Sequence, residues 1–443
     1  MRIVSPPSTT EIMDVLVLAG CGVDEAQTAS EAEALTGSME WLAGVLYPLR
    51  VRAARNPGQV ARPARRAMGS CSTPQPETGG SRRVIGGGII PVMIRLPLRR
   101  STLPLLTVVL FGCARASEPL PPPEEILLIV DSTTRALSVR SINGLASAVT
   151  IPLVGAPATV TEVTARDGWA IVPLGPADAV VVVDLRGDSV SRVVVLATGS
   201  GATGAAIVDD SLAYVGNPGL NTVTRINYLT GDTASVAVGR TPQGLAATRG
   251  KVFVLNGNLG GVPGAPSWIS VVDPVTNRLA TGIDSILLPG PGNAAYSTLT
   301  PDGALYVLNR GPVGTTTAAR LSQVDPVNRQ ELGSFGGFGI APGPIANNGR
   351  DRLYLSSPTE GLMVFDLFSR QVLRGAGNGV PITGNSSVAV DSRGRIYALE
   401  PGPCTAGASG TLHVLRSDLS ESRALPLTGC PIGAAVVQIQ PEP

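Results

Sequence analysis

The chain repeats one pattern of hydrophobic and polar positions from about residue 126 to its end. In each copy a short apolar run ends in Asp, a turn follows, and a second apolar run begins. The two closest copies span residues 271–278 and 323–329, and looser copies span residues 182–186 and 364–370. Short apolar runs bounded by turn residues are typical of buried strands. The pattern therefore predicts strands that are joined by tight hairpins.

Further strands recur around these hairpins at a regular interval. The third strand of six successive units ends 41 to 52 residues after the previous one, at Asp184, Asn227, Asp273, Asp325, Asp366 and Arg416. Four short strands in a repeat of this length match the blades of a propeller. We therefore predict an all-β chain that folds as a β-propeller of four-stranded antiparallel blades over residues 126–440.

The two ends of the repeat region hold incomplete units that complete one another. Residues 126–130, 136–140 and 147–153 supply a second, third and fourth strand, and residues 433–439 supply a lone first strand. Joining them makes a seventh blade, so the C-terminal first strand closes the ring and no sheet edge stays open. A β-sandwich or an open β array is the alternative architecture.

Composition narrows the possible functions. The net charge of +1 and the pI near 7.6 give no reason to expect nucleic acid as a partner. The single histidine, His413, excludes a metal site built from several histidines. No Ser–His–Asp or Cys–His pair can be assembled around it, so a nucleophile would lack its base. We expect no catalytic residue, no metal and no cofactor.

The first 92 residues do not show the strand pattern. Residues 49–83 are rich in Arg, Pro, Ser and Gly, which favours a disordered segment or upstream DNA translated from a start codon chosen too early. The alternative is that these arginines form a basic patch for nucleic acid.

Residues 93–112 have the layout of a secretory signal peptide. Arginines within residues 95–100 precede an apolar run at residues 103–111, which is too short to span a bilayer permanently. The residues before Cys113 match a bacterial lipobox, so we predict lipidation at Cys113 and a Pro-rich tether over residues 113–125. Cys21 follows a rival lipobox, but the apolar run before it is very short and carries acidic residues on its N-terminal side.

Two stretches of the repeat carry a resemblance to a known family. Residues 301–309 hold an Asp-Gly turn that leads into a strand, and residues 269–274 hold a strand that ends in Asp-Pro. The repeat resembles the YVTN-type seven-bladed propellers of bacterial envelope proteins, which are related to lactonase-like propellers. The resemblance covers roughly residues 124–440 and implies a fold much more strongly than an activity.

Blade topology assigns each connection to one of two faces. The hairpins within strand pairs one–two and three–four share one face, where we expect Asp273 and Asp325 to bond backbone N–H groups of their own turns. The other connections share the opposite face, which holds Cys404 and Cys430. In an oxidising compartment these two cysteines are expected to form a disulfide, worth on the order of 3 kcal/mol for a loop of this length.

The face of the two cysteines also carries long loops, near residues 256–267, 309–318 and 401–409. Propellers commonly bind partners at such loops and at the mouth of the channel. The candidate binding residues on this face are Asn217, Asn256, Trp268, Asn309 and Arg310. The alternatives are that the asparagines form turns and that the tryptophan is wedged between blades.

These observations lead to two main hypotheses about function. The first is a monomeric, lipid-anchored protein of the bacterial cell envelope, facing the periplasm or the exterior, whose propeller is a binding or scaffold module for a protein, peptide or glycan partner. The second is a lactonase-like hydrolase that uses the channel mouth, which would need charged or metal-binding residues gathered there. A purely structural or decayed propeller is a third alternative.

Overall fold

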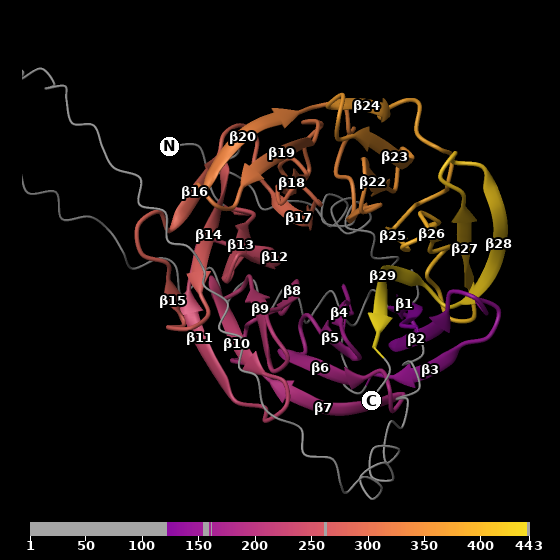
Figure 1. Ribbon diagram of the computed structural model, residues 1–443, viewed down its shortest axis with the longest axis horizontal. Helices are drawn as coiled ribbons and strands as arrows, with labels where there is room; N and C mark the ends of the chain where they lie inside the picture. The colour runs from indigo at the N-terminus through magenta and orange to yellow at the C-terminus, as the bar shows by residue number, and fades with distance from the viewer. Residues whose placement is uncertain (1–121, 154–158, 161, 261–263, 441–443) are drawn as a thin grey trace, which may run out of the picture. The chain divides into compact units, whose positions relative to one another are not determined.

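The computed structural model describes residues 122–153, 159–160, 162–260 and 264–440. All regular elements in these ranges are β-strands, and they form seven antiparallel sheets that are arranged as the blades of a β-propeller (Figure 1). The prediction of an all-β, seven-bladed propeller is confirmed. No helix in the described part of the chain is long and apolar enough to cross a membrane.

Each blade runs from an inner strand at the channel to an outer strand at the rim. The blade in which the two ends of the ring meet consists, in this direction, of β29 (Pro431–Ile439), β1 (Glu124–Asp131), β2 (Ala136–Ser141) and β3 (Val149–Pro152). The next blade consists of β4 (Thr164–Arg166), β5 (Trp169–Pro173), β6 (Ala179–Asp184) and β7 (Ser189–Val195). It is followed by β8 (Ala205–Ile207), β9 (Leu212–Asn217), β10 (Thr222–Asn227) and β11 (Thr233–Ala237).

The remaining blades follow in chain order. One consists of β12 (Pro242–Thr248), β13 (Lys251–Asn256), β14 (Ser267–Asp273), β15 (Arg278–Leu279) and β16 (Ser285–Leu288). The next consists of β17 (Ala294–Leu299), β18 (Leu305–Asn309), β19 (Arg320–Asp325) and β20 (Gln330–Phe335). The last two are β21 (Ile345–Asn347), β22 (Arg352–Ser357), β23 (Gly361–Asp366) and β24 (Gln371–Arg374), then β25 (Ser387–Val390), β26 (Ile396–Glu400), β27 (Ser409–Leu415) and β28 (Glu421–Thr428).

The ring closes as the sequence predicts. Strand β29 pairs antiparallel with β1, and Leu127 faces Val436 across the pair. Strand β1 begins at Glu124, two residues before the expected start of the propeller. The seam between the closing blade and its neighbour is also held on one side by Glu125, whose carboxylate accepts hydrogen bonds from the backbone N–H (3.0 Å) and hydroxyl (2.7 Å) of Ser392.

The innermost strands form an unbroken circle around a central channel. In order they are β29, β4, β8, β12, β17, β21 and β25, each in contact with the next, and β25 returns to β29 (Figure 1). Each inner strand begins at the connection from the preceding blade, and each except β29, which is the last strand of the described chain, ends at the hairpin to its second strand. We call the face with the hairpins within strand pairs the hairpin face, and the opposite one the loop face.

Burial follows the position of each strand within its blade. Second and third strands are buried along nearly their whole length, as in β5 and β6, because neighbouring blades cover both of their sides. Outer strands alternate between exposed and half-buried residues, as in β11 and β20, because at the rim of the ring protein covers only one of their two sides.

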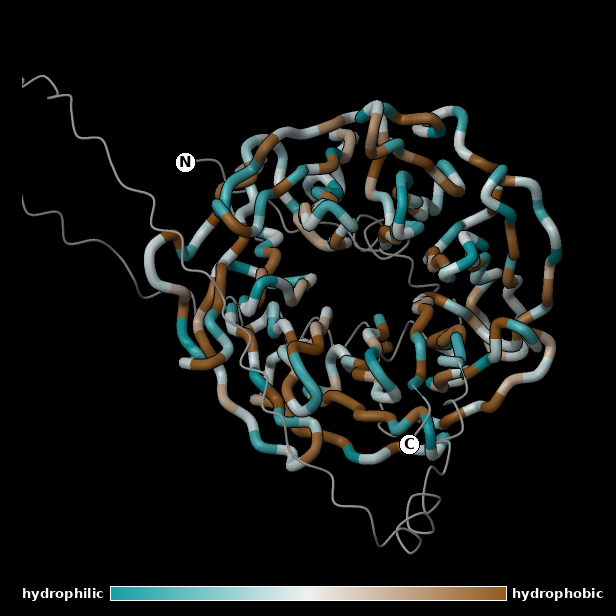
Figure 2. The backbone as a smooth tube through the Cα atoms, in the orientation of Figure 1, coloured by the Kyte–Doolittle hydropathy of each residue, from teal (hydrophilic) through white to brown (hydrophobic). Residues whose placement is uncertain are grey.

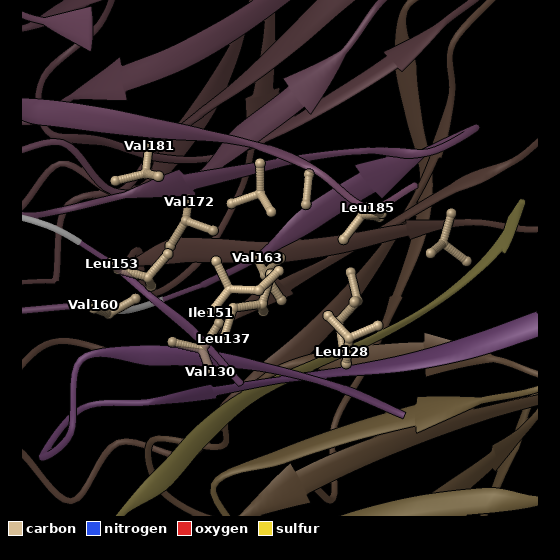
Figure 3. Packing of buried hydrophobic residues seen from close by; sticks show 14 of the residues in the cluster. Leu128, Val130, Leu137, Ile151, Leu153, Val160, Val163, Val172, Val181 and Leu185 are labelled. Carbon is tan, nitrogen blue, oxygen red and sulfur yellow. The ribbon is translucent and has the colours of Figure 1, made fainter. Parts of the chain in front are cut away.

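The core consists of apolar layers between adjacent blades. Figure 3 shows one such layer, in which Leu128 and Val130 of β1 and Val172 of β5 lie among aliphatic side chains of the two blades. Hydrophobic segments recur in every blade (Figure 2). At about 25 cal/mol per Å² of buried apolar area, these repeated layers dominate the favourable free energy of folding.

The blade that begins with β12 departs from the predicted four strands. Its outer strand is broken, so that β15 and β16 both pair with β14. Gly282, with φ of 79°, lies in the interruption, where the left-handed backbone bends the chain away from the sheet. The longest spacing in the sequence repeat, 52 residues from Asp273 to Asp325, falls on this blade.

The Asp-Pro hairpins have the turn chemistry that the sequence predicts. In one of them, Asp325 Oδ1 accepts hydrogen bonds from the backbone N–H groups of Val327 (2.8 Å) and Asn328 (3.1 Å). Asp273 makes the same pair of bonds two and three residues ahead. The side chain and backbone N–H of Asn328 hold the pKa of Asp325 below its ordinary value. These aspartates therefore stabilise turns, and the hairpin face repeats this local solution from blade to blade.

Candidate functional site

The channel contains a cavity of about 160 Å³ near the loop face. Its lining comes from the first residues of β17, β21, β25 and β29, the first half of β12, and the residues just before β4. The lining residues are Glu162, Val163, Gly244, Leu245, Ala295, Tyr296, Ser297, Pro344, Ile345, Ser387, Val388, Gly433 and Ala434. Five distant segments of the ring and the segment before β4 therefore converge on one concave, partly open space.

Glu162 is the one acidic residue in this lining. The structure gives its carboxyl group no hydrogen-bond or ion-pair partner among the described residues. Its side chain is half-buried, and the walls of the channel remove part of its contact with water. This loss of water penalises the charged form and raises the pKa of Glu162 to about 7. The carboxyl group is thus poised between its neutral and charged forms near neutral pH.

Tyr296 shares the cavity lining with this carboxyl group, and Arg310 packs on the Tyr296 ring. Burial raises the pKa of the Tyr296 phenol, which stays neutral at physiological pH. The Arg310 guanidinium carbon lies 5.5 Å from the centre of the Tyr296 ring, a cation–π distance. Arg310 also donates to the carbonyl oxygens of Pro342 (2.7 Å) and Ala341 (3.3 Å), which belong to the connection between β20 and β21. The predicted contact residue Arg310 therefore lies half-exposed at the channel mouth, already bonded to a loop.

The three predicted asparagines are buried and play one shared structural role. Each ends a second strand, and its Nδ2 donates to a hydroxyl group on the third strand, two positions beyond its register partner. The pairs are Asn217 with Thr224 (2.8 Å), Asn256 with Ser270 (2.9 Å) and Asn309 with Ser322 (2.9 Å). Each Oδ1 atom is buried without a hydrogen-bond partner among the described residues. These side chains brace neighbouring strands and are not presented on the surface to a ligand.

Trp268 lies beside Asn256 under a tight connection. The two residues face each other across β13 and β14, and the Asn256 Nδ2 donates to the Trp268 carbonyl oxygen (3.1 Å). A Cβ atom added at Gly239 would collide with both the Asn256 carboxamide and the Trp268 indole nitrogen. The connection from β11 to β12 therefore packs directly onto this pair, which favours the packing interpretation of Trp268 over a contact with a partner.

The two cysteines of the loop face form the expected disulfide. Cys404, between β26 and β27, and Cys430, between β28 and β29, are bonded with Cα atoms 4.7 Å apart. The backbone N–H of Ser132 donates to the Cys430 carbonyl oxygen (3.0 Å), which ties the β1–β2 connection to the same point. The bond thus anchors the chain immediately before the closing strand. The predicted lipidation site, Cys113, lies outside the described residues.

His413 lies in the third strand β27 and bridges the two strands beside it. Its Nδ1 lies 2.7 Å from Glu421 Oε1 and its Nε2 lies 3.0 Å from Glu400 Oε2. Both ring nitrogens are therefore engaged with carboxylates of adjacent strands. Among the described residues, no group of three or more His, Cys, Asp or Glu side chains could hold a metal ion.

Among the depressions outside the channel, two bear on the choice of site. One, of about 340 Å³, lies on the loop face between the loops around Asn258 and Val313. A larger one, of about 700 Å³, lies on the hairpin face beside Glu124 and Gln440, near both ends of the described chain. The larger depression is lined by the carboxyl groups of Glu124 and Asp188, but both residues are exposed, whereas Glu162 in the channel is half-buried, so the channel is the stronger candidate site.

Comparison with known proteins identifies neither a family nor an activity. No family model matches the chain, and no curated protein matches it. Among solved structures, a chain of Kuenenia stuttgartiensis hydrazine synthase is similar, with 15% identity and a TM-score of 0.45 over 58% of this chain and 77% of that one. A similarity of this size says nothing about activity.

Proposed function

We propose that this protein is a cell-envelope β-propeller that binds a protein, peptide or glycan partner on its loop face. The observation that carries the proposal is the enclosed Glu162 carboxyl group at the channel mouth, where the inner strands of the ring converge. The long loop that contains Val313 lies on the same face. Convergent polar groups in a concave, mostly preformed site are the usual mark of a binding site.

The proposal includes export and a lipid anchor on Cys113. It is supported by the arginines, the apolar run and the lipobox within residues 93–113. We also propose that the repeats are of the YVTN type, on the strength of residues 269–274 and 301–309. Mass spectrometry of the natural protein's N-terminus tests the anchor, because a diacylated Cys113 supports it and an intact Met1 contradicts it.

Photo-crosslinking in intact cells tests the binding face. Val313 lies on the loop face and is 68% exposed, and Val275 lies on a hairpin turn and is 87% exposed. Replacing each valine in turn by a photoreactive amino acid gives probes that are matched in residue type and exposure. The proposal expects one defined crosslinked species from position 313 and none from position 275. The reverse pattern, or equal labelling, would contradict it.

A lactonase-like hydrolase is the second candidate. The observation in its favour is that a carboxyl group with a pKa of about 7 suits a general base near neutral pH. Turnover of simple lactones by the purified protein, lost in the variant Glu162→Gln, would support this candidate. Capture of a partner without turnover favours the first.

A further inference from the structure

The channel cavity combines one acidic group with neutral hydrogen-bonding groups and open space. Glu162 supplies the carboxyl group, and Ser297 and Ser387 supply hydroxyl groups. The Ser387 hydroxyl oxygen accepts a bond from the backbone N–H of Ala434 (3.1 Å), which fixes its position in the wall. The rest of the wall is largely glycine, alanine and aliphatic side chains, which leaves the middle of the cavity free.

The half-buried Glu162 carboxylate lacks the partners that compensate charges inside proteins. Buried charges in proteins are paired, bind metals, or become neutral through a pKa shift. No described cation is bonded to Glu162, and the Arg310 guanidinium is engaged by two loop carbonyl groups and the Tyr296 ring. A ligand that brings a positive charge into the cavity would therefore stabilise the ionised carboxylate.

We propose that this cavity binds the primary ammonium group of a small amine or of a lysine side chain, with Glu162 as its counter-ion. The inference rests on the proposed function in so far as it assigns a ligand class to the same channel mouth. Three N–H donors suit a wall that offers a carboxylate and hydroxyl oxygens. A single carboxylate is poorly suited to Ca²⁺, which takes six to eight oxygen ligands.

The size of the cavity agrees with a ligand of a few heavy atoms. Its volume of about 160 Å³ is close to that of an engineered cavity of about 150 Å³ that binds benzene. An alkylammonium ion of three or four carbons fits within it. The surrounding strands limit the access of bulk water, so that the attraction between the ammonium and the carboxylate is screened less than at an open surface.

The charges around Glu162 define how binding should depend on pH. Tyr296 remains neutral throughout the range from pH 6 to pH 8, so Glu162 is the group of the lining that titrates there. An ammonium ligand binds the ionised form. With a midpoint of about 7, the ionised fraction and hence the apparent affinity rise about tenfold from pH 6 to pH 8.

Isothermal titration of the purified protein with n-propylammonium tests the proposal, and n-propanol serves as the neutral ligand of the same shape. The expected results are saturable binding of the amine, at least tenfold weaker binding of the alcohol, and loss of amine binding in Glu162→Gln. The control Glu421→Gln makes the same chemical change on the outer strand β28 and should bind the amine as the wild type does. In a second arm, Nα-acetyl-lysine methylamide, whose side-chain ammonium group is free, replaces propylammonium. Stronger binding of this compound identifies a lysine side chain as the source of the ammonium group.

Three outcomes would overturn the inference: no amine binding by the folded wild-type protein, equal binding of amine and alcohol, or unchanged binding in Glu162→Gln. Circular dichroism establishes that each variant is folded. Crosslinking at position 313 in cells is scored separately. If that crosslink persists while the amine fails to bind, the ammonium assignment is wrong and the loop-face function stands. If the amine binds and the crosslink is absent, the ammonium assignment stands and the loop-face function is wrong.

Discussion

The two faces of the propeller satisfy their polar groups in different ways. On the hairpin face, Asp273 and Asp325 bond backbone N–H groups two and three residues ahead, so each turn is complete within itself. Buried nitrogens without hydrogen-bond partners occur near the hairpin face at Arg352 and Arg395, whereas on the loop face several buried oxygens lack partners among the described residues. These oxygens belong to Asp131, Asn217, Asn256, Asn309 and Asn385. The hairpin face thus follows local rules that repeat from blade to blade.

The loop face departs from those rules, and there the chain gathers its disulfide, its long loops and its enclosed carboxyl group. Polar groups that lack local partners cost stability, and they are retained most often where a site or a closure needs them. This contrast supports the proposal that the binding site lies on the loop face. Substitutions on the loop face should therefore change stability more than substitutions on the hairpin face, and only loop-face substitutions should change binding.

The disulfide should make the largest single contribution. Replacing Cys404 and Cys430 together by Ser removes a bond between residues 26 positions apart and should lower the free energy of unfolding by about 3 kcal/mol. Thermal unfolding with and without reductant measures the effect. Reductant should destabilise the wild type and leave the double variant unchanged. Equal unfolding of the oxidised and reduced wild type would show that the bond does not secure the closure.

Glu162→Gln should stabilise the protein at high pH. The folded pKa of about 7 lies above the ordinary value of about 4.3, so stability that is present below pH 4 is lost as the pH rises through 7. After allowance for its remaining solvent contact, the penalty on the charged form is about 2 kcal/mol at pH 8. Urea unfolding should show the gain at pH 8 and almost none at pH 4. The same gain at both pH values would contradict a raised pKa.

Asn256→Ala should destabilise the protein without affecting the channel. It removes the donor to the Ser270 hydroxyl and to the Trp268 carbonyl in a fully buried position, a loss of about 1.5 kcal/mol. Asn328→Ala, on an exposed turn, is the surface comparison and should cost less. If Asn256→Ala instead weakened binding of n-propylammonium, the asparagines would belong to the binding site and not to the frame.

Asp325→Ala should have the smallest effect. The exposed turn loses two backbone hydrogen bonds, and solvent limits the cost to about 1 kcal/mol at pH 7. The pKa of Asp325 is lowered in the folded protein, so this stabilisation is present above about pH 4 and disappears as the pH falls. Asp325→Asn keeps an acceptor oxygen and should cost less than alanine. A variant as destabilised at pH 2 as at pH 7 would contradict the turn mechanism.

The fold and the frame of the site could be predicted from the sequence because they depend on local, repeated signals. The hairpins at Asp273 and Asp325 specify the period, and the split unit specifies the pairing of Leu127 with Val436. Because the connections that hold Cys404 and Cys430 lie on the same face of adjacent blades, their pairing could also be predicted. Each of these steps needs only the order of strands within a blade.

Glu162 could not be predicted as a site residue for the same reason. Its environment is made by strands as distant in sequence as β29, and no local pattern reports that six segments enclose one carboxyl group. The available signal was weak: a charged residue beside the apolar Val160 and Val163 near the start of a first strand. The position of the asparagines at strand ends could be predicted, but the role of their side chains could not. The direction of each carboxamide depends on a hydroxyl group two positions along the neighbouring strand.

The pKa of Glu162 tests most directly whether the loop face holds a carboxyl group that is shielded from water. Carboxyl ¹³C NMR of protein labelled at glutamate, compared with Glu162→Gln to identify the signal, follows this one group as the pH changes. We predict a midpoint of about 7, which n-propylammonium shifts to lower pH. A midpoint near the ordinary 4.3 would mean that the carboxyl group is well hydrated. This result would contradict the candidate binding site at the channel mouth.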